Sequence, residues 1–169
     1  MSADGDDLHS VVIFRLGGRL FAIAVTDVRE VVPYAWLDLP PRMPSFVKGV
    51  LNLGGQAVPV LRLDDLLGME PAHHIGLDAS ILIMKGGDAP LGLLVDHVEG
   101  VRPAASFQYT PIDDSASFQG CVAGQLHGPQ GAIHLVSWRH VLMEEERRRL
   151  EQFQSDAQQR LSELADGVP

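Results

Sequence analysis

The chain of 169 residues has a single cysteine, Cys121, and no apolar run long enough to span a membrane. One cysteine cannot form an internal disulfide, which is typical of proteins that fold in a reducing compartment. The longest apolar runs, such as Ser80–Met84, fall far short of the roughly 20 residues that a transmembrane helix needs. The N-terminus is acidic and polar, whereas a secretory signal is basic and then apolar. We therefore expect a cytoplasmic protein.

Basic residues are also in the minority, with 13 Lys and Arg against 22 Asp and Glu and a formal net charge of −9. Such a chain repels a phosphate backbone on average, and no basic stripe interleaved with aromatic residues offsets this repulsion. We therefore exclude nucleic acid as a partner. The acidic residues gather near the two ends, and we interpret them as a solvated surface that maintains solubility. Residues 1–10 are expected to form a flexible acidic N-terminus.

No motif that would assemble a catalytic, cofactor or metal site is present. The seven histidines include no His-Glu-x-x-His pattern, and His73 and His74 are neighbours in a polar loop, where they would not share one ion. The glycine-rich segments lack the Lys-Ser/Thr of a phosphate-binding loop. His97 and His134 lie in strand-like segments and are expected to face outward, and Cys121 is interpreted as a small buried hydrophobe. The sequence predicts no enzymatic activity, no cofactor and no metal.

From residue 11 to about residue 136, short runs of Val, Ile and Leu are broken about every 8–12 residues by Gly, Pro or Asp. This spacing is typical of a β-barrel or sandwich. Strands over residues 11–16 and 20–25 are predicted to form a hairpin at Gly17 and Gly18. Further strands are predicted over residues 57–63, Ser80–Met84, Leu91–Val95, 97–101, 119–125 and 132–136. Turns are predicted over residues 52–56, 86–88 and 128–131, with a helical turn over residues 64–67.

Two segments interrupt this strand pattern. Thr26 is expected to cap a helical turn over residues 27–31, in which Val28 and Val31 would face inward. Residues 33–46 contain four prolines and show no periodicity, which excludes a central strand.

From Ser137 onward the apolar period changes from 2 to 3.6, which predicts a helix with Ser137 as its N-cap. The charged run that begins at Glu144 places acidic and basic residues four apart, a spacing that stabilises helices. This helix either lies along the β domain or packs against another chain, because its other faces are charged. Its apolar stripe, a candidate docking or oligomerisation surface, consists of Leu150, Phe153, Ala157, Leu161 and Leu164.

Three blocks of the sequence resemble the CheW family of chemotaxis adaptors. They are LFAIAVTDVREVV (residues 20–32), LPPRMPSFVKGVLNLGGQAVPVLRLDDLLG (residues 39–68) and LGLLVDHVEGV (residues 91–101). The most specific part is F-V-K-G-V-L-N-L-x-G-x-x-V-P-V-x-x-L over residues 46–63. The resemblance covers residues 11–143 and leaves residues 144–169 as an additional charged amphipathic helix and tail.

The resemblance implies an all-β fold of two small, five-stranded, SH3-like barrels packed on a shared apolar seam, followed by the C-terminal helix. It also implies a non-enzymatic adaptor that couples the cytoplasmic tip of a chemoreceptor to the regulatory domain of a CheA-type histidine kinase, in an array at the membrane. An auxiliary pathway is favoured by the long tail. The alternative is a self-associating structural subunit that does not contact the kinase. The expected partner-binding residues are Val28, Glu30, Val31, Lys48, Asn52, Gly54, Gly55, Val95 and Val98. For the four valines, packing inside the barrels is the alternative interpretation.

One position departs from the family pattern. The family usually has Asn-Leu-Arg-Gly where this chain has Asn-Leu-Gly-Gly at residues 52–55, and the resemblance implies that the arginine pairs with Glu30. A pair of glycines also loosens a turn. We expect Gly54→Arg to alter partner affinity more than stability, because exposed ion pairs contribute only about 0–1 kcal/mol. The remaining candidates to pair with Glu30 are Arg29, Arg62 and Lys48.

Overall fold

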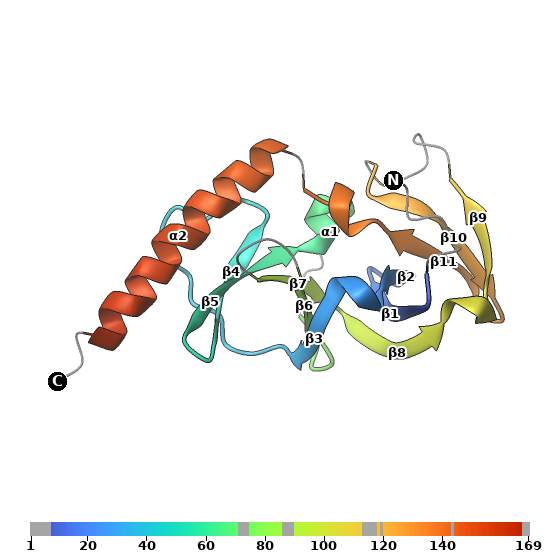
Figure 1. The fold of residues 1–169 in the computed structure, drawn as a ribbon, viewed down its shortest axis with the longest axis horizontal. Helices are drawn as coiled ribbons and strands as arrows, with labels where there is room; N and C mark the ends of the chain where they lie inside the picture. Colours follow the sequence, from blue (N-terminus) through green and yellow to red (C-terminus); the bar gives the residue numbers. More distant parts are fainter. Residues whose placement is uncertain are drawn as a thin grey trace.

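The computed structural model describes residues 8–70, 75–85, 90–112, 118, 120–142 and 144–166. These residues form two sheets, a short helix α1 and a long C-terminal helix α2 (Figure 1). The first sheet has the strand order β8-β1-β2-β11-β10-β9 and the second has the order β3-β6-β7-β5-β4. The bounds are β1 Ser10–Leu16, β2 Arg19–Ala24, β3 Val28–Pro33, β4 Val47–Leu53, β5 Gln56–Arg62, α1 Leu63–Leu66, β6 Ser80–Met84, β7 Leu91–Val95, β8 His97–Pro103, β9 Gln108–Pro111, β10 Val122–Gly128, β11 Gly131–Val136 and α2 Glu144–Asp166.

In each sheet the two edge strands follow one another along the chain. A 3-10 turn, Ala104–Ser106, joins β8 to β9. Residues 34–46 join β3 to β4, and within them Asp38 pairs with Val50 of β4 through two backbone hydrogen bonds of 2.9 Å. The chain therefore brings the edges of each sheet toward one another and curves it into a small barrel. This confirms the predicted all-β class, although the first sheet has six strands instead of five.

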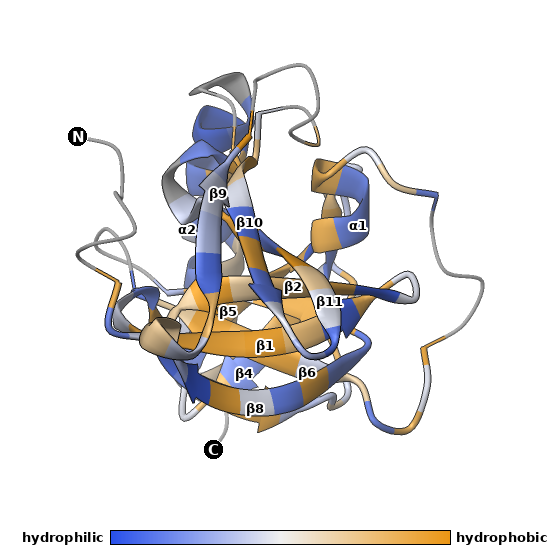
Figure 2. Ribbon diagram, turned by 90° about the vertical axis from the view of Figure 1, so that its right-hand side faces the viewer, coloured by the Kyte–Doolittle hydropathy of each residue, from blue (hydrophilic) through white to orange (hydrophobic). Residues whose placement is uncertain are grey.

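Strands at the junction of the two sheets carry apolar side chains on both faces. In β1, Val12 and Phe14 pack in a core shared by both sheets, while Val11 and Ile13 pack in a second cluster with β2, β10 and β11. A strand buried on both faces reads as a continuous apolar run, and Figure 2 shows most of β1 in orange. The predicted apolar seam is therefore confirmed. Fully buried members of the shared core include Phe14, Phe21, Leu61, Leu82 and Leu93.

The helical turn predicted after Thr26 is wrong. Thr26 lies in a 3-10 turn, Val25–Asp27, which has no side-chain cap, and the following residues form β3. β3 pairs with β6 along its length, and Val31 is 43% exposed instead of facing inward. The helical spacing of Val28 and Val31 is a local signal, and the hydrogen bonds to β6 override it.

Most of the other strand predictions are confirmed, including the hairpin at Gly17 and Gly18 and the bounds of β6 and β7. β10 begins three residues later than predicted, at Val122, and the short edge strand β9 was not predicted. The expectations for residues 1–7, for His73 and His74 and for the turn at residues 86–88 lie outside the described residues.

α2 confirms the predicted C-terminal helix and settles how its apolar stripe packs. The helix lies against β5, at the outer side of the five-stranded sheet (Figure 1). Leu150, Phe153 and Ala157 are buried in the shared core, Leu161 is partly buried, and Leu164 is 70% exposed. Of the two alternatives, the stripe therefore packs mainly on the chain's own barrel. Ser137 precedes a 3-10 turn, Trp138–His140, without capping it.

Candidate docking surface

The predicted partner-binding residues divide into a buried group and an exposed group. Val95 is fully buried and Val28 is 9% exposed, while Val98 is partly buried against the shared core. These valines therefore pack inside the protein. Lys48 is half-buried. The remaining predicted residues are exposed, and they are Glu30, Val31, Asn52, Gly54 and Gly55.

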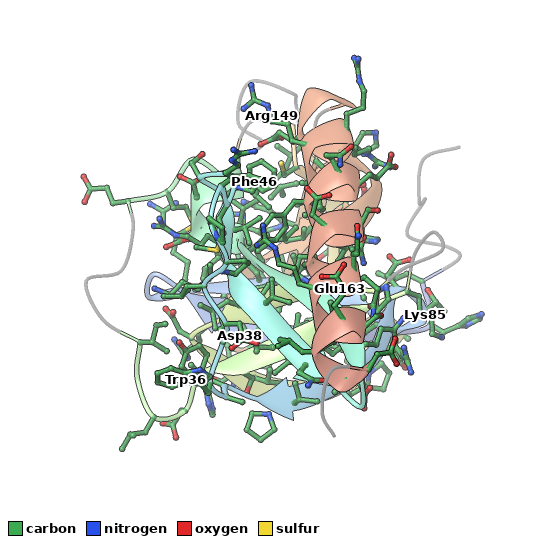
Figure 3. The ribbon with its side chains drawn as sticks, turned by 90° about the vertical axis from the view of Figure 1, so that its left-hand side faces the viewer. Trp36, Asp38, Phe46, Lys85, Arg149 and Glu163 are labelled. Atoms are coloured by element: carbon green, nitrogen blue, oxygen red, sulfur yellow. The ribbon has the colours of Figure 1, made fainter. Side chains whose placement is uncertain are left out.

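The exposed group lies on the two edge strands of the five-stranded sheet, β3 and β4, and at the turn after β4, and we call the surface that they form with the segment between them the open edge. It comprises β3, the linking residues 34–46 and the β4–β5 turn. Sequence reasoning missed three of its apolar side chains, since Tyr34 is 37%, Trp36 88% and Leu39 69% exposed. Figure 3 shows Trp36 and Asp38 on the linking segment, beside the five-stranded sheet. Large apolar residues among prolines, in a segment that is not a strand, were the signal available in the sequence.

The linking segment is held close to β4, which determines how its side chains point. Leu37 is buried, and Asp38 forms the bridge to Val50. Gly49 permits this approach, because a Cβ at that position would lie 2.7 Å from the Cβ of Leu37. With Leu37 fixed inward, its neighbours Trp36 and Asp38 are exposed. The exposed indole is therefore attached to an anchored backbone, and tryptophan is enriched among the residues that dominate binding at protein interfaces.

The β4–β5 turn is a two-residue hairpin loop. Leu53 pairs with Gln56, and the residues between them, Gly54 and Gly55, have φ values of +62° and +88°. Positive φ at both positions is the geometry of a type I′ turn, which favours glycine. The side-chain oxygen of Asn52 accepts a hydrogen bond of 2.9 Å from the N–H of Gly55. The sequence predicted this turn, and the structure shows that Asn52 braces it.

The charged residues of the open edge form only weak contacts with one another. Glu30 lies beside Arg29, with 4.0 Å between Nε of Arg29 and Oε1 of Glu30, and both side chains are about half exposed. Arg62, a second candidate, is 3.8 Å from Asp64 instead. An exposed pair at this separation contributes little to stability. The carboxylate of Glu30 is therefore not committed to a strong internal ion pair with Arg29.

Two ionisable side chains outside the open edge are shifted by burial. His134 was expected to face outward, but its ring packs against Phe21 and Phe118, with centroids 5.4 Å and 5.0 Å away. Burial, and then the charge of Arg19, lower the pKa of His134. Burial, and then Glu146, raise the pKa of Cys121, which is 2% exposed, in agreement with its interpretation as a small hydrophobe. Among the residues that the structure describes, no group of three or more His, Cys, Asp or Glu side chains is placed to hold a metal.

Comparisons with known proteins agree with this architecture. The model of the family described as "CheW-like domain" matches residues 10–146. The chain belongs to this CheW-like family. It is 29% identical to the chemotaxis protein CheW of Rhizobium meliloti, over 82% of this chain and 90% of that protein. It is 31% identical to the protein PilI of Pseudomonas aeruginosa, over 69% of this chain and 66% of that protein.

A solved structure supports the same assignment. The scaffolding protein CheW of Thermoanaerobacter tengcongensis superposes with a TM-score of 0.69 at 25% identity, over 80% of this chain and 88% of that one. The CheW-like family consists of non-enzymatic scaffold proteins, and this chain is an adaptor of chemosensory arrays. The matched domain ends at residue 146, so nearly all of α2 lies beyond it. No helix in the described part of the chain is both long enough and apolar enough to cross a membrane.

Proposed function

We propose that this CheW-like chain couples the cytoplasmic tip of a chemoreceptor to the regulatory domain of a CheA-type histidine kinase. It acts in the cytoplasm, within arrays assembled at the membrane by its partners, and has no catalytic role of its own. The pathway is an auxiliary one, because the usual arginine is replaced by Gly54 and because α2 extends the domain. Such an adaptor acts by binding, since a docked partner biases the kinase between conformations.

The open edge carries this proposal, with the receptor tip as its occupant. Val31 on β3 and Tyr34, Trp36 and Leu39 on the linking segment that follows it are exposed apolar side chains. A receptor tip is a helical hairpin, and a helix lays its apolar face against a surface of this kind. Glu30 and Lys48 add charges of both signs that can orient the helix.

The alternative function, self-association through the C-terminal helix, has less support. The stripe that would form such an interface is largely used within the chain, because Leu150, Phe153 and Ala157 are buried in the shared core. Only its last members remain accessible, with Leu164 70% exposed. Two exposed or half-exposed leucines are a small contact for a stable interface.

Titration of a soluble receptor-tip fragment and of the kinase regulatory domain against the purified chain tests the proposal. Leu39→Ala should weaken receptor binding about fivefold or more, because it removes apolar contact at the open edge. Leu77→Ala is the matched control, since Leu77 is fully exposed and lies outside the open edge. If both variants bind the receptor fragment as tightly as the wild type does, the open edge is not the receptor site. Absence of binding to either partner by the wild type would contradict the adaptor role.

A further inference from the structure

One side chain of α2 is hydrogen-bonded to the backbone of the β4–β5 turn. The side-chain oxygen of Gln158 accepts a 2.9 Å hydrogen bond from the N–H of Ala57, and its side-chain nitrogen lies 3.4 Å from the carbonyl oxygen of Gly55. Gly55 is therefore held from both sides, since its N–H already donates to Asn52. The two bonds from Gln158 connect residues 101 and 103 positions apart in the chain.

The strand pairing explains why this backbone is available to a helix. β5 pairs with β7 only from Val60 onward, where Val60 lies opposite Gly92. Ala57 precedes this paired part, so its N–H has no β7 residue opposite it. Gln154, one helical turn before Gln158, donates in the same way to the carbonyl oxygen of Pro90, at 3.2 Å. Residues four apart lie on one helix face, so the two amides together continue the hydrogen bonding of β5 and β7 beyond the paired residues.

The turn depends on such bonds because it has no side chains of its own. A Cβ at Gly54 or at Gly55 would meet no atom within 4 Å, so neither position packs against the rest of the protein. Glycine also has the widest choice of backbone conformations. Packing does not restrict the conformation of this turn. Hydrogen bonds between its backbone and the side chains of Asn52 and Gln158 therefore do so.

We propose that Gln158 is a positioning residue for partner binding, which holds the β4–β5 turn in the one conformation that the partner recognises. This inference rests on the proposed function, in which the turn is part of the receptor-facing edge. It gives α2, which lies almost wholly beyond the family domain, a specific role at that edge. A surface ordered before binding loses less conformational entropy when it docks, and so binds more tightly.

The test compares Gln158→Ala with Gln159→Ala in the full chain. Gln159 is the matched control, because it is exposed and its amide donates only along the helix, to Glu163 at 3.1 Å. We expect amide hydrogen exchange at Ala57 to accelerate in Gln158→Ala alone. Affinity for a soluble receptor-tip fragment should fall about two- to tenfold, the effect of losing one or two hydrogen bonds. Gln158→Met keeps the bulk of the side chain but lacks its amide. This variant should bind the receptor fragment as weakly as Gln158→Ala does.

The possible outcomes separate this inference from the proposed function. Unchanged exchange at Ala57 in Gln158→Ala, or full receptor affinity in that variant, overturns the positioning role. Recovery of affinity in Gln158→Met also overturns it, because packing alone would then be sufficient. If the wild type itself fails to bind the receptor fragment, the proposed function fails and the positioning role fails with it.

Discussion

At the scale of single residues, the backbone of Gly54 limits what can replace it. Its φ of +62° lies in the left-handed region, where an L-residue costs about 1–2 kcal/mol relative to glycine. Gly54→Arg should therefore lower the free energy of unfolding by about that amount, measured by urea denaturation. The sequence predicts little change in stability for this substitution, because a φ angle cannot be read from it.

A matched substitution separates stability from recognition. Gly18, in the β1–β2 turn of the other sheet, has a φ of +77° and equally open space around its Cβ position. Gly18→Arg should lower stability about as much as Gly54→Arg but leave receptor affinity unchanged. A loss of receptor affinity in both variants would mean that destabilisation, and not the position of the turn, affects binding.

Site residues could be predicted from the sequence only where their exposure follows from local chemistry. Asn52 and the glycine pair lie in a turn, which sequence patterns identify well. Val95 lies on a strand that is apolar throughout and packs on both faces. Such a strand has no alternation of polar and apolar residues, so the sequence does not show whether Val95 is exposed or buried. Trp36 is exposed because its neighbour Leu37 is anchored beneath it against Gly49, a tertiary contact that the sequence does not reveal.

At the scale of elements, α2 contributes unequally to stability along its length. Phe153 is 7% exposed in the shared core, whereas Leu164 is 70% exposed near the end of the same stripe. Phe153→Ala should lower the free energy of unfolding by about 3–5 kcal/mol, the usual cost of removing a buried aromatic ring. Leu164→Ala should change it by no more than about 0.5 kcal/mol. Chemical denaturation followed by circular dichroism measures both values.

The same comparison examines the predicted boundary at residue 143, which treats α2 as an addition to a complete domain. Equal, small effects for Phe153→Ala and Leu164→Ala would support that boundary and contradict the packing described for α2. A large effect of Phe153→Ala alone would mean that the β domain needs the helix to complete its core.

Elements could be predicted where the periodicity of the sequence was strong. The change to period 3.6 after Ser137 located α2, but an apolar stripe does not specify the surface that will cover it. β3 was missed because two valines three residues apart also fit a helical turn. β9 has only four residues and ends at Pro111, and an edge strand this short leaves little alternation to detect.

At the scale of the whole molecule, the two sheets share one core. Phe14 and Phe21 of the six-stranded sheet pack in the same cluster as Leu82 and Leu93 of the five-stranded sheet. We therefore expect a single cooperative unfolding transition, with calorimetric and van't Hoff enthalpies equal. Two resolved transitions in scanning calorimetry would contradict a shared core and indicate that the barrels fold independently.

The two-barrel architecture was predicted from the family resemblance and not from the strand pattern itself. Alternating apolar runs indicate strands, but they do not specify which strands pair across a separation of more than 100 residues, as β2 and β11 do. His134 illustrates the difficulty, because its ring meets Phe21 only through this long-range parallel pairing.

The strand order also determines when each sheet can form during synthesis. All strands of the five-stranded sheet lie within residues 28–95, so they emerge from the ribosome together. β1 and β2 emerge first but await β11, which ends at Val136, a delay on the order of ten seconds at typical translation rates. During this interval Val11 and Ile13 lack the cluster that later covers them. We therefore expect the nascent β1–β2 hairpin to expose apolar side chains, which favour aggregation, until β11 has been made.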